Sequence, residues 1–508
     1  MTENRIKKAE KNFVSSTIFN VINLLTTFAL RTLFIYFLGI EYLGVNGLFA
    51  NILGMLSLAE LGVSSAIAFS LYKPLAGGNK DKIRQLVRFY KKAYRVIALI
   101  IMALGLALIP FLHLIVNGVE NVSDLYLIYI LFLANTVFTY FISYKSILVT
   151  ADQKEYIVNN TNTIAKVITT ILQSIILVVF RNYILFLIIE LAVSVLSKLY
   201  INHQVNKTYP YINDKDKVEL PQDEKKTIFR KIRALFLHKI GEVSIYQTDN
   251  ILTSILINTE TVGLVSNFTL IISNVNKFIV SFFNSAVAGL GNVIAVDSVE
   301  KRLKVAKRYD FISYCFYSWS ATCLYFLLGP FISLWIGSDK MIDYGTICLL
   351  CVNFYMTGMR VALTNVRNAA GIFEKDKWVS IIQAVTNIAI SIILAINLGL
   401  VGIYLGTFIS GLIPSIIRPY KVYKYVFMTS SRQYFLEYIK RIVLLSVAVI
   451  GLQLAFSVIP FSSAIVEIIA KLTTVSIVIP LMIVAFYHGR DEFCFTKGLI
   501  LGKIKKEK

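Results

Sequence analysis

Fourteen apolar segments, each about as long as a membrane is thick, constrain this chain more than any other feature of its sequence. A helix needs about 20 apolar residues to cross a hydrocarbon core of roughly 30 Å. We expect such helices near 13–38, 43–71, 93–116, 125–149, 157–180, 183–200, 235–257, 263–292, 309–336, 344–366, 379–397, 402–417, 442–459 and 465–487. With 56% hydrophobic and only 16% charged residues, the chain has more apolar surface than a water-soluble core can bury. The sequence therefore predicts an all-α polytopic membrane protein with about 14 transmembrane helices.

The basic residues are distributed unevenly about these segments. The net charge is +21, and nearly all of the 51 lysines and arginines fall on one side of the predicted membrane. The opposite loops contain only Arg181 and Lys340. Because loops rich in lysine and arginine stay in the cytoplasm, both termini are expected to be cytoplasmic. Membrane orientation explains the positive charge, and we expect no nucleic-acid partner.

Two stretches of the sequence, one in each half of the chain, resemble each other. "ALRTLFIYFLGIEYLG" at 29–44 lies over "TDNILTSILINTETVG" at 248–263, and the match places Glu41 over Glu260 and Gly44 over Gly263. A unit of six helices that is repeated keeps its orientation, so the copies are expected to be related by a pseudo-two-fold axis along the membrane normal. This predicts two six-helix bundles around a central cavity. The expected segments are an N-terminal bundle at 1–200, a polar cytoplasmic linker at 201–234, a second bundle at 235–425, and two further helices with a basic tail at 426–508.

Charged side chains inside the predicted membrane region mark candidate functional positions. Each costs between about 3 and more than 10 kcal/mol at mid-bilayer, so such residues normally face protein or water. They are Arg31, Glu60, Lys166, Glu190, Glu242, Asp249, Lys277, Arg360, Glu467 and Lys471. In the helix at 13–38, Asn20, Asn23 and Arg31 belong to one polar stripe, and in the helix at 235–257 Asp249 and Asn250 stand where the first copy has Leu30 and Arg31. The first two helices of each half are therefore predicted to line a polar pathway.

Three of these patterns can also be explained by helix packing, without a role in transport. Arg31 could pair with Asp249 or Glu60 as a buried ion pair that only specifies packing. The stripe around Lys166 in the helix at 157–180 is explained almost as well by hydrogen bonds between helices. Glu467 and Lys471, one helical turn apart, are expected to form a local pair.

No enzyme signature is found in the sequence. The four histidines have no metal-ligand spacing, four of the five cysteines lie in predicted helices, and no phosphate-binding loop occurs. The loops on the outer side are too short to carry a catalytic platform. We therefore expect no catalytic residue, no metal and no cofactor, and passage across the membrane is the expected task.

The helix count, the basic inner surface, the short outer loops, and the stretches "RTLFIYFLGIEYLGVNGLFA" and "TDNILTSILINTETVG" together resemble the polysaccharide (Wzx-like) flippases. These belong to the multidrug/oligosaccharidyl-lipid/polysaccharide exporter superfamily. The resemblance implies alternating access between two six-helix lobes and a cationic cavity. It also implies transport of a polyprenyl-diphosphate-linked oligosaccharide to the outer leaflet of the bacterial cytoplasmic membrane, for capsule or O-antigen synthesis. A polysaccharide polymerase and glycosyltransferases are possible partners, in addition to membrane lipid.

The family's arginine falls on Arg31 and its acidic position on Asp249. The expected substrate contacts are Arg31, Lys277, Asn20, Asn23, Asn250 and Lys166. The carboxylates Asp249, Glu60 and Glu242 make the expected cavity less cationic than a diphosphate site requires, so they are candidates for coupling to a sodium or proton gradient. A cation-coupled multidrug antiporter of the same superfamily is the main alternative. A membrane-embedded glycosyltransferase or polymerase would need a large loop or soluble domain, which the sequence lacks.

Overall fold

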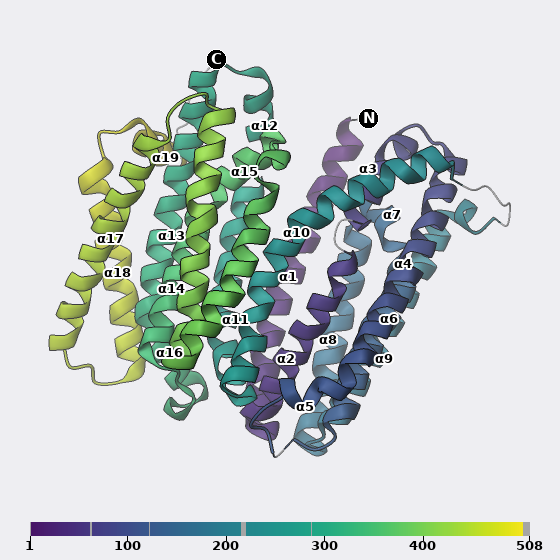
Figure 1. The fold of residues 1–508 in the computed structure, drawn as a ribbon, viewed down its shortest axis with the longest axis horizontal. Helices are drawn as coiled ribbons and strands as arrows, with labels where there is room; N and C mark the ends of the chain where they lie inside the picture. The colour runs from purple at the N-terminus through teal and green to yellow at the C-terminus, as the bar shows by residue number, and fades with distance from the viewer. Residues whose placement is uncertain (1, 61–62, 121, 215–219, 286, 501–508) are drawn as a thin grey trace. The chain divides into compact units, whose positions relative to one another are not determined.

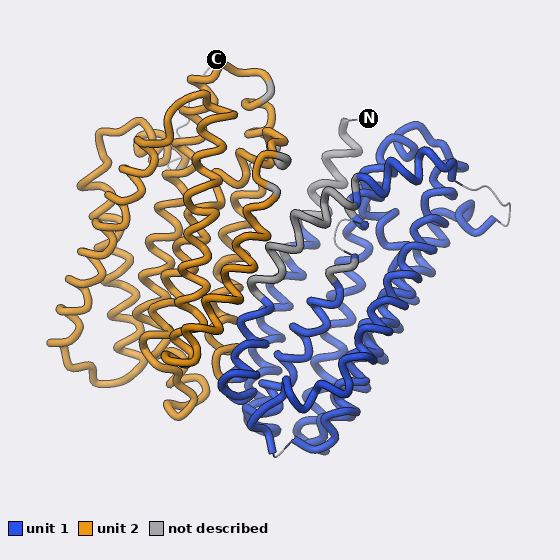
Figure 2. Tube along the Cα trace, in the orientation of Figure 1, with its two compact units in different colours: residues 1–263 blue, residues 264–508 orange. Residues whose placement is uncertain are grey.

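The computed structural model describes residues 2–60, 63–120, 122–214, 220–285 and 287–500, and over these ranges it contains helices and no β-strand (Figure 1). The all-α membrane fold expected from the sequence is confirmed. Contacts within the chain define two compact units, residues 1–263 and residues 264–508, which are drawn in blue and orange in Figure 2.

Unit 1 contains the first ten helices and the start of the eleventh. Their bounds are α1 (Thr2–Leu38), α2 (Ile40–Leu56), α3 (Val63–Ala76), α4 (Lys80–Leu108), α5 (Leu112–Ile115), α6 (Leu125–Ser143), α7 (Ser146–Ala151), α8 (Tyr156–Val179), α9 (Tyr183–Thr208) and α10 (Gln222–Leu256). α1 packs along α8, and α9 packs against both α6 and α8. α10 packs against α2 and α3, so contact density places it in unit 1, whereas the sequence repeat assigns it to the second bundle. The repeat-based boundaries at 200, 234 and 425 stay a prediction.

Unit 2 is organised around one long helix, α13 (Val299–Ile336). The other helices are α11 (Thr259–Ser285), which begins in unit 1, α12 (Val287–Val296), α14 (Tyr344–Met359), α15 (Val361–Ala370), α16 (Phe373–Tyr425), α17 (Arg432–Val458), α18 (Ala464–Tyr487) and α19 (Asp491–Ile500). α13 packs against α14, α15, α17, α18 and α19, and its Tyr314 and Tyr317 are fully buried. The two helices expected beyond the repeat, α17 and α18, thus attach to the core of unit 2 through α13.

α16 contains two of the predicted membrane segments in one element. Gly399 interrupts it with φ 56°, a left-handed conformation that glycine adopts without a Cβ penalty. Ser391 Oγ donates to the carbonyl oxygen of Ile403 at 3.0 Å, and Asn387 Nδ2 donates to Thr407 Oγ1 at 3.0 Å. The two halves of α16 therefore run antiparallel, as the two separate predicted segments require.

Each of the fourteen predicted apolar segments is helical over most of its described residues. Among the described residues, eleven helices are long and apolar enough to cross a membrane. The count is lower than fourteen for three reasons: α16 is one element, α2 has only 17 residues, and the side chains of residues 233–246 in α10 lie outside those described.

The internal repeat is visible in where helices begin. Three pairs of helices start at the same spacing along the chain as Gly44 and Gly263, namely at Ile40 and Thr259, at Lys80 and Val299, and at Leu125 and Tyr344. The caps before the second pair also correspond, because Asn79 accepts a hydrogen bond from the backbone N–H of Lys82 and Ser298 accepts one from that of Lys301. Side-chain caps of this kind fix where a helix starts, so both copies encode the same boundary.

The two glycines paired by the repeat meet in space. A Cβ atom at Gly44 would lie 2.0 Å from the carbonyl oxygen of Thr259, and a Cβ atom at Gly263 would lie 2.4 Å from the carbonyl oxygen of Ile40. Ile40 and Thr259 are themselves repeat equivalents, so the contact between the starts of α2 and α11 is reciprocal. Only glycine permits backbones to approach this closely.

A buried ion pair fastens α17 to α13. Arg441 Nη1 donates to Asp310 Oδ2 at 2.5 Å, and the two side chains are 6% and 8% exposed. We expect Asp310→Ala to destabilise the full-length protein by about 3 kcal/mol, because it leaves the buried charge of Arg441 with only the more distant Glu437, whose Oε1 lies 3.9 Å from Arg441 Nε. The measurement is the melting midpoint of the purified protein in detergent.

A local pair serves as the control for this prediction. Lys471 Nζ donates to Glu467 Oε1 at 2.5 Å within α18, which confirms the pair expected from the sequence. Glu467→Ala should cost less than about 0.5 kcal/mol. Replacing both buried charges, with Asp310→Leu and Arg441→Met, should recover much of the stability. If Asp310→Ala lowered the melting midpoint no more than Glu467→Ala does, the proposed role of the buried ion pair would be contradicted.

Candidate functional site

A small, open cavity lies in unit 1 between α1, α2, α8 and α9. It has a volume of about 110 Å³ and is lined by Thr27, Leu30, Arg31, Phe34, Leu43, Asn46, Lys166 and Phe186. Drug-sized ligands occupy pockets of roughly 300–1,000 Å³. The cavity is therefore large enough for one small charged or polar group and too small for an oligosaccharide or a drug.

Aromatic rings and one amide form the wall of the cavity. The ring of Phe34 on α1 meets those of Tyr183 and Phe186 on α9 edge-to-face, with centroids 5.4 and 5.3 Å apart. Asn46 Nδ2 on α2 donates to the hydroxyl of Tyr183 at 2.9 Å. Such edge-to-face packing fixes ring positions, so the helix faces around the cavity are well defined.

The charged side chains that line the cavity are cationic. Arg31 on α1 and Lys166 on α8 both line it, and none of the lining residues is acidic. Glu190 on α9 is close enough to Lys166 to attract it, and it accepts a hydrogen bond from Gln173 Nε2 at 3.4 Å. Because the charged side chains among the lining residues are both cationic, the lining favours an anionic ligand over a cationic one.

The structure brings together two of the six residues predicted to contact substrate. Arg31 and Lys166 share the cavity. Of the other four, Asn20 is exposed on α1, Asn23 is half-buried on α1, Asn250 is half-buried on α10, and Lys277 is exposed on α11 in unit 2. None of these four lines the cavity. The expected roles of all six residues stay predictions.

Glu60, a predicted coupling residue, is surrounded by hydroxyl groups. Its Oε1 accepts hydrogen bonds from Ser64 Oγ and from the hydroxyl of Tyr94, the latter at 2.5 Å, and its Oε2 accepts from the hydroxyl of Tyr140 at 3.4 Å. Tyr90 contacts the same Ser64 at 2.9 Å. Over the described ranges, the recorded partners of Glu60 are therefore hydroxyls from α3, α4 and α6.

The other two coupling candidates lie on α10. Asp249 is 7% exposed, so its carboxylate is removed from solvent. The side chain of Glu242 lies outside those described.

The polar side chains of the α8 stripe divide between hydrogen bonds to neighbouring helices and the lining of the cavity. Asn159 Nδ2 donates to Ser16 Oγ on α1 at 2.8 Å, and Asn162 Oδ1 accepts from Lys198 Nζ on α9 at 3.3 Å. Gln173 Nε2 donates to the carbonyl oxygen of Phe186 at 3.2 Å. Hydrogen bonding between helices thus accounts for most of the stripe, and Lys166 is the member that lines the cavity.

The sequence predicted the segment that contains α2 among the lining helices but did not single out Asn46, and it did not predict a contribution from α9. Asn46 lies in "LGVNGLF", where a single polar residue inside an apolar run is a usable signal. Tyr183 and Phe186 begin α9 and give no signal of their own, since aromatic residues at a helix start are common at membrane interfaces.

No protein-family model matches the chain, and no curated protein matches it. Solved structures do. The chain is similar to the lipid II flippase MurJ in an inward closed conformation, with TM-score 0.65, 17% identity, and coverage of 94% of this chain and 98% of MurJ. It is similar to an inward-facing multidrug resistance MATE family transporter of the MOP superfamily, with TM-score 0.61, 14% identity, and coverage of 80% and 96%. It is also similar to the Vibrio cholerae MATE transporter VcmN, with TM-score 0.57, 12% identity, and coverage of 82% and 96%.

These likenesses concern architecture. The chain has the helical membrane fold shared by MurJ and the MATE transporters, and at identities of 12–17% they show the fold alone.

Proposed function

We propose that this protein flips a polyprenyl-diphosphate-linked oligosaccharide repeat unit from the inner to the outer leaflet of the bacterial cytoplasmic membrane by alternating access. The observation that carries the proposal is that Arg31 and Lys166 line one cavity inside unit 1. A phosphate group is the small anion that such a cavity suits. An arginine keeps its charge in a low-dielectric site and offers a planar fork of N–H donors that matches phosphate oxygens.

The fraction of this chain that aligns with each solved structure supports a lipid-linked substrate. The alignment with MurJ, described as a lipid II flippase, covers 94% of this chain, whereas those with the MATE transporters cover 80–82%. We infer that the additional helices belong to a transporter whose substrate has a lipid tail. The sugars are expected to lie outside the cavity, because its 110 Å³ holds only a charged group.

The experiment that tests the proposed substrate uses a strain whose own flippase is depleted. We expect that expression of this protein restores surface polysaccharide and removes the lipid-linked oligosaccharide that accumulates on the inner leaflet. Continued accumulation, with the protein present in the membrane at normal amounts, would refute the proposal.

A cation-coupled multidrug antiporter is the second candidate. The buried carboxylate of Asp249 and the carboxylate of Glu60, which lies among hydroxyl groups, favour this candidate because carboxylates suit cations. The cationic cavity opposes it, since a cationic drug is repelled by Arg31 and Lys166. Expression in a drug-sensitive strain separates the two, because only an antiporter would raise resistance to cationic dyes.

Coupling to a sodium or proton gradient is part of the proposal. A carboxylate removed from water gains from binding a cation. Asp249 is 7% exposed, and Glu60 is half-buried among hydroxyl groups that offer further oxygen ligands. We expect transport in proteoliposomes to respond to one of the two gradients and to lose that response in Glu60→Gln or Asp249→Asn. Glu300→Gln, at an exposed carboxylate, is the control and should leave the response intact. Transport indifferent to both gradients would eliminate the coupling.

A further inference from the structure

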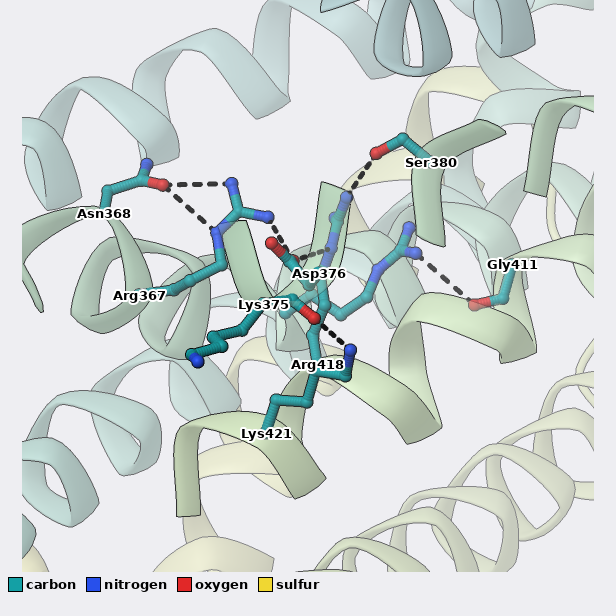
Figure 3. Close-up of polar contacts among 9 residues, drawn as sticks. Arg367, Asn368, Lys375, Asp376, Ser380, Gly411, Arg418 and Lys421 are labelled. Carbon is teal, nitrogen blue, oxygen red and sulfur yellow. Dashed lines mark hydrogen bonds and ion pairs between the residues drawn. The ribbon is translucent and has the colours of Figure 1, made fainter. Parts of the chain in front are cut away.

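A cluster of basic side chains surrounds one buried carboxylate at the turn between α15 and α16. Asp376 is 3% exposed; its Oδ2 accepts a hydrogen bond from Arg367 Nη1 at 2.6 Å and lies 3.3 Å from Arg418 Nε (Figure 3). Arg418 Nη2 also donates to Ser380 Oγ at 2.7 Å. One carboxylate thus holds two guanidinium groups, one from α15 and one from the second half of the α16 hairpin, and the cluster of these three side chains retains an excess positive charge.

Three lysines extend this charge toward the surface. Lys375 and Lys424 are exposed, and Lys421 is half-buried and donates to the carbonyl oxygen of Lys375. The Nζ atoms of Lys375 and Lys424 lie 5.2 and 5.6 Å from the centroid of the Tyr425 ring. Over the described side chains, no carboxylate is within ion-pair distance of these three lysines. Their positive charge is therefore not neutralised within the part of the chain that the structure describes.

Two apolar stripes lead away from the lysines along the α16 hairpin. The stripe on its first half consists of Trp378, Ile382 and Val385, and that on its second half consists of Leu412, Ile416 and Tyr420; all six side chains are 38–63% exposed. Residues at such spacings of three and four share one face of a helix. Exposed apolar faces of a membrane-spanning helix contact acyl chains, and Trp and Tyr favour the level of the lipid head groups.

We propose that this turn binds the phosphate head group of an anionic phospholipid, with the acyl chains lying along the two stripes. Basic pockets at the ends of membrane helices on the cytoplasmic side bind anionic head groups, and the distribution of lysine and arginine predicts that this end is cytoplasmic. The lysines supply point charges for the phosphate, while the ion pairs of Asp376 hold α15 and the two halves of the hairpin in register. A soluble phosphate would gain the charge but nothing from the stripes, so a lipid is the expected occupant.

Trp378 provides a reporter inside the proposed site. The chain has three tryptophans, so Trp319→Phe with Trp335→Phe leaves Trp378 as the single fluorophore. Full-length protein is placed in phosphatidylcholine bilayers that contain either brominated phosphatidylglycerol or brominated phosphatidylcholine, and quenching of Trp378 is measured. A near-surface lysine favours anionic lipid by about 1 kcal/mol, or roughly fivefold. We therefore expect phosphatidylglycerol to be preferred at Trp378 by at least about fivefold.

Matched variants separate the site from general surface charge. Lys375→Gln with Lys421→Gln and Lys424→Gln should reduce the preference to near one. The control Lys73→Gln with Lys80→Gln and Lys207→Gln removes three exposed lysines of unit 1 and should leave the preference unchanged. Lys421→Arg should retain it, which distinguishes loss of charge from loss of fold.

Two results would overturn the proposal. One is equal quenching of Trp378 by the two brominated lipids in the protein that carries all its lysines. The other is relief of quenching by inorganic phosphate beyond that caused by chloride at the same ionic strength, because it would identify a site for soluble anions.

Discussion

Arg31→Ala is expected to lower export of the lipid-linked oligosaccharide by more than about a hundredfold. Arg31 lines the cavity between α1, α2, α8 and α9, where its guanidinium is proposed to hold a phosphate of the carrier. A hydrogen bond to a charged group contributes about 1.5–3 kcal/mol, and a bidentate arginine makes two such bonds. Export is measured in a strain without its own flippase, with the amount of protein in the membrane checked alongside.

Substitutions around Arg31 distinguish a phosphate contact from a packing role. Arg31→Lys should retain a fraction of export, since a point charge remains but the planar fork is lost. Lys166→Ala should cause a smaller loss than Arg31→Ala, because a lysine supplies only a point charge, whereas an arginine supplies a planar fork of donors that matches phosphate oxygens. Arg181→Ala removes an exposed arginine just before α9 and should leave export unchanged.

The double change Arg31→Ala with Asp249→Ala tests the ion-pair interpretation. If Arg31 served only to neutralise Asp249, removing both charges would restore export that either single change destroys. We expect no rescue. Full export by Arg31→Ala alone would equally exclude a phosphate contact at this position.

Gly44→Ala and Gly263→Ala are each expected to reduce transport severely. Their Cβ atoms would overlap the carbonyl oxygens of Thr259 and Ile40 at 2.0 and 2.4 Å. Because the clash is with backbone and not with a mobile side chain, it can be relieved only by moving α2 away from the start of α11. Overpacking of this kind typically costs about 1–3 kcal/mol, and here it acts on a contact that we propose must form and open during alternating access.

Gly47 on the same helix provides the control for this prediction. A Cβ atom at Gly47 would lie 3.7 Å from Val262 Cγ1, which is an ordinary van der Waals distance. Gly47→Ala should therefore transport at close to the normal rate. Equal activity of Gly44→Ala and Gly47→Ala would contradict the importance of the close contact.

The sequence predicts the positions of the helices because long apolar segments have few alternatives in a membrane. The sequence also predicts the repeat. The spacing between its two copies recurs between the first residues of α2 and α11, of α4 and α13, and of α6 and α14. The pairing of Gly44 with Gly263 by alignment corresponds to a physical contact. Hydropathy and internal similarity therefore carry most of the information on architecture.

Side-chain partners were harder to predict, since they depend on how each helix is rotated and which neighbour it packs against. The stripes of the first two helices in each half suggested a shared pathway. Within unit 1, the cavity lined by Arg31 includes α2 as well, and it takes its second cation from α8 and the ring of Phe186 from α9. The short 3-10 helix Ser57–Glu60, which follows α2 inside the predicted segment 43–71, gave no signal in the apolar pattern, and neither did the Asp376 cluster. Asp376 meets Arg367 across a turn and Arg418 across the whole α16 hairpin, and helical periodicity encodes neither pairing.

Flipping by the purified protein tests the central claim most directly. The full-length chain is reconstituted into liposomes with a fluorescent polyprenyl-diphosphate oligosaccharide in both leaflets, and a membrane-impermeant reductant bleaches the label that reaches the outer leaflet. We predict that the protein exposes nearly all of the label, that Arg31→Ala exposes only the half initially outside, and that Arg181→Ala behaves like the unaltered protein. Label that stays half protected with the unaltered protein, or equal exposure with Arg31→Ala, would contradict the account.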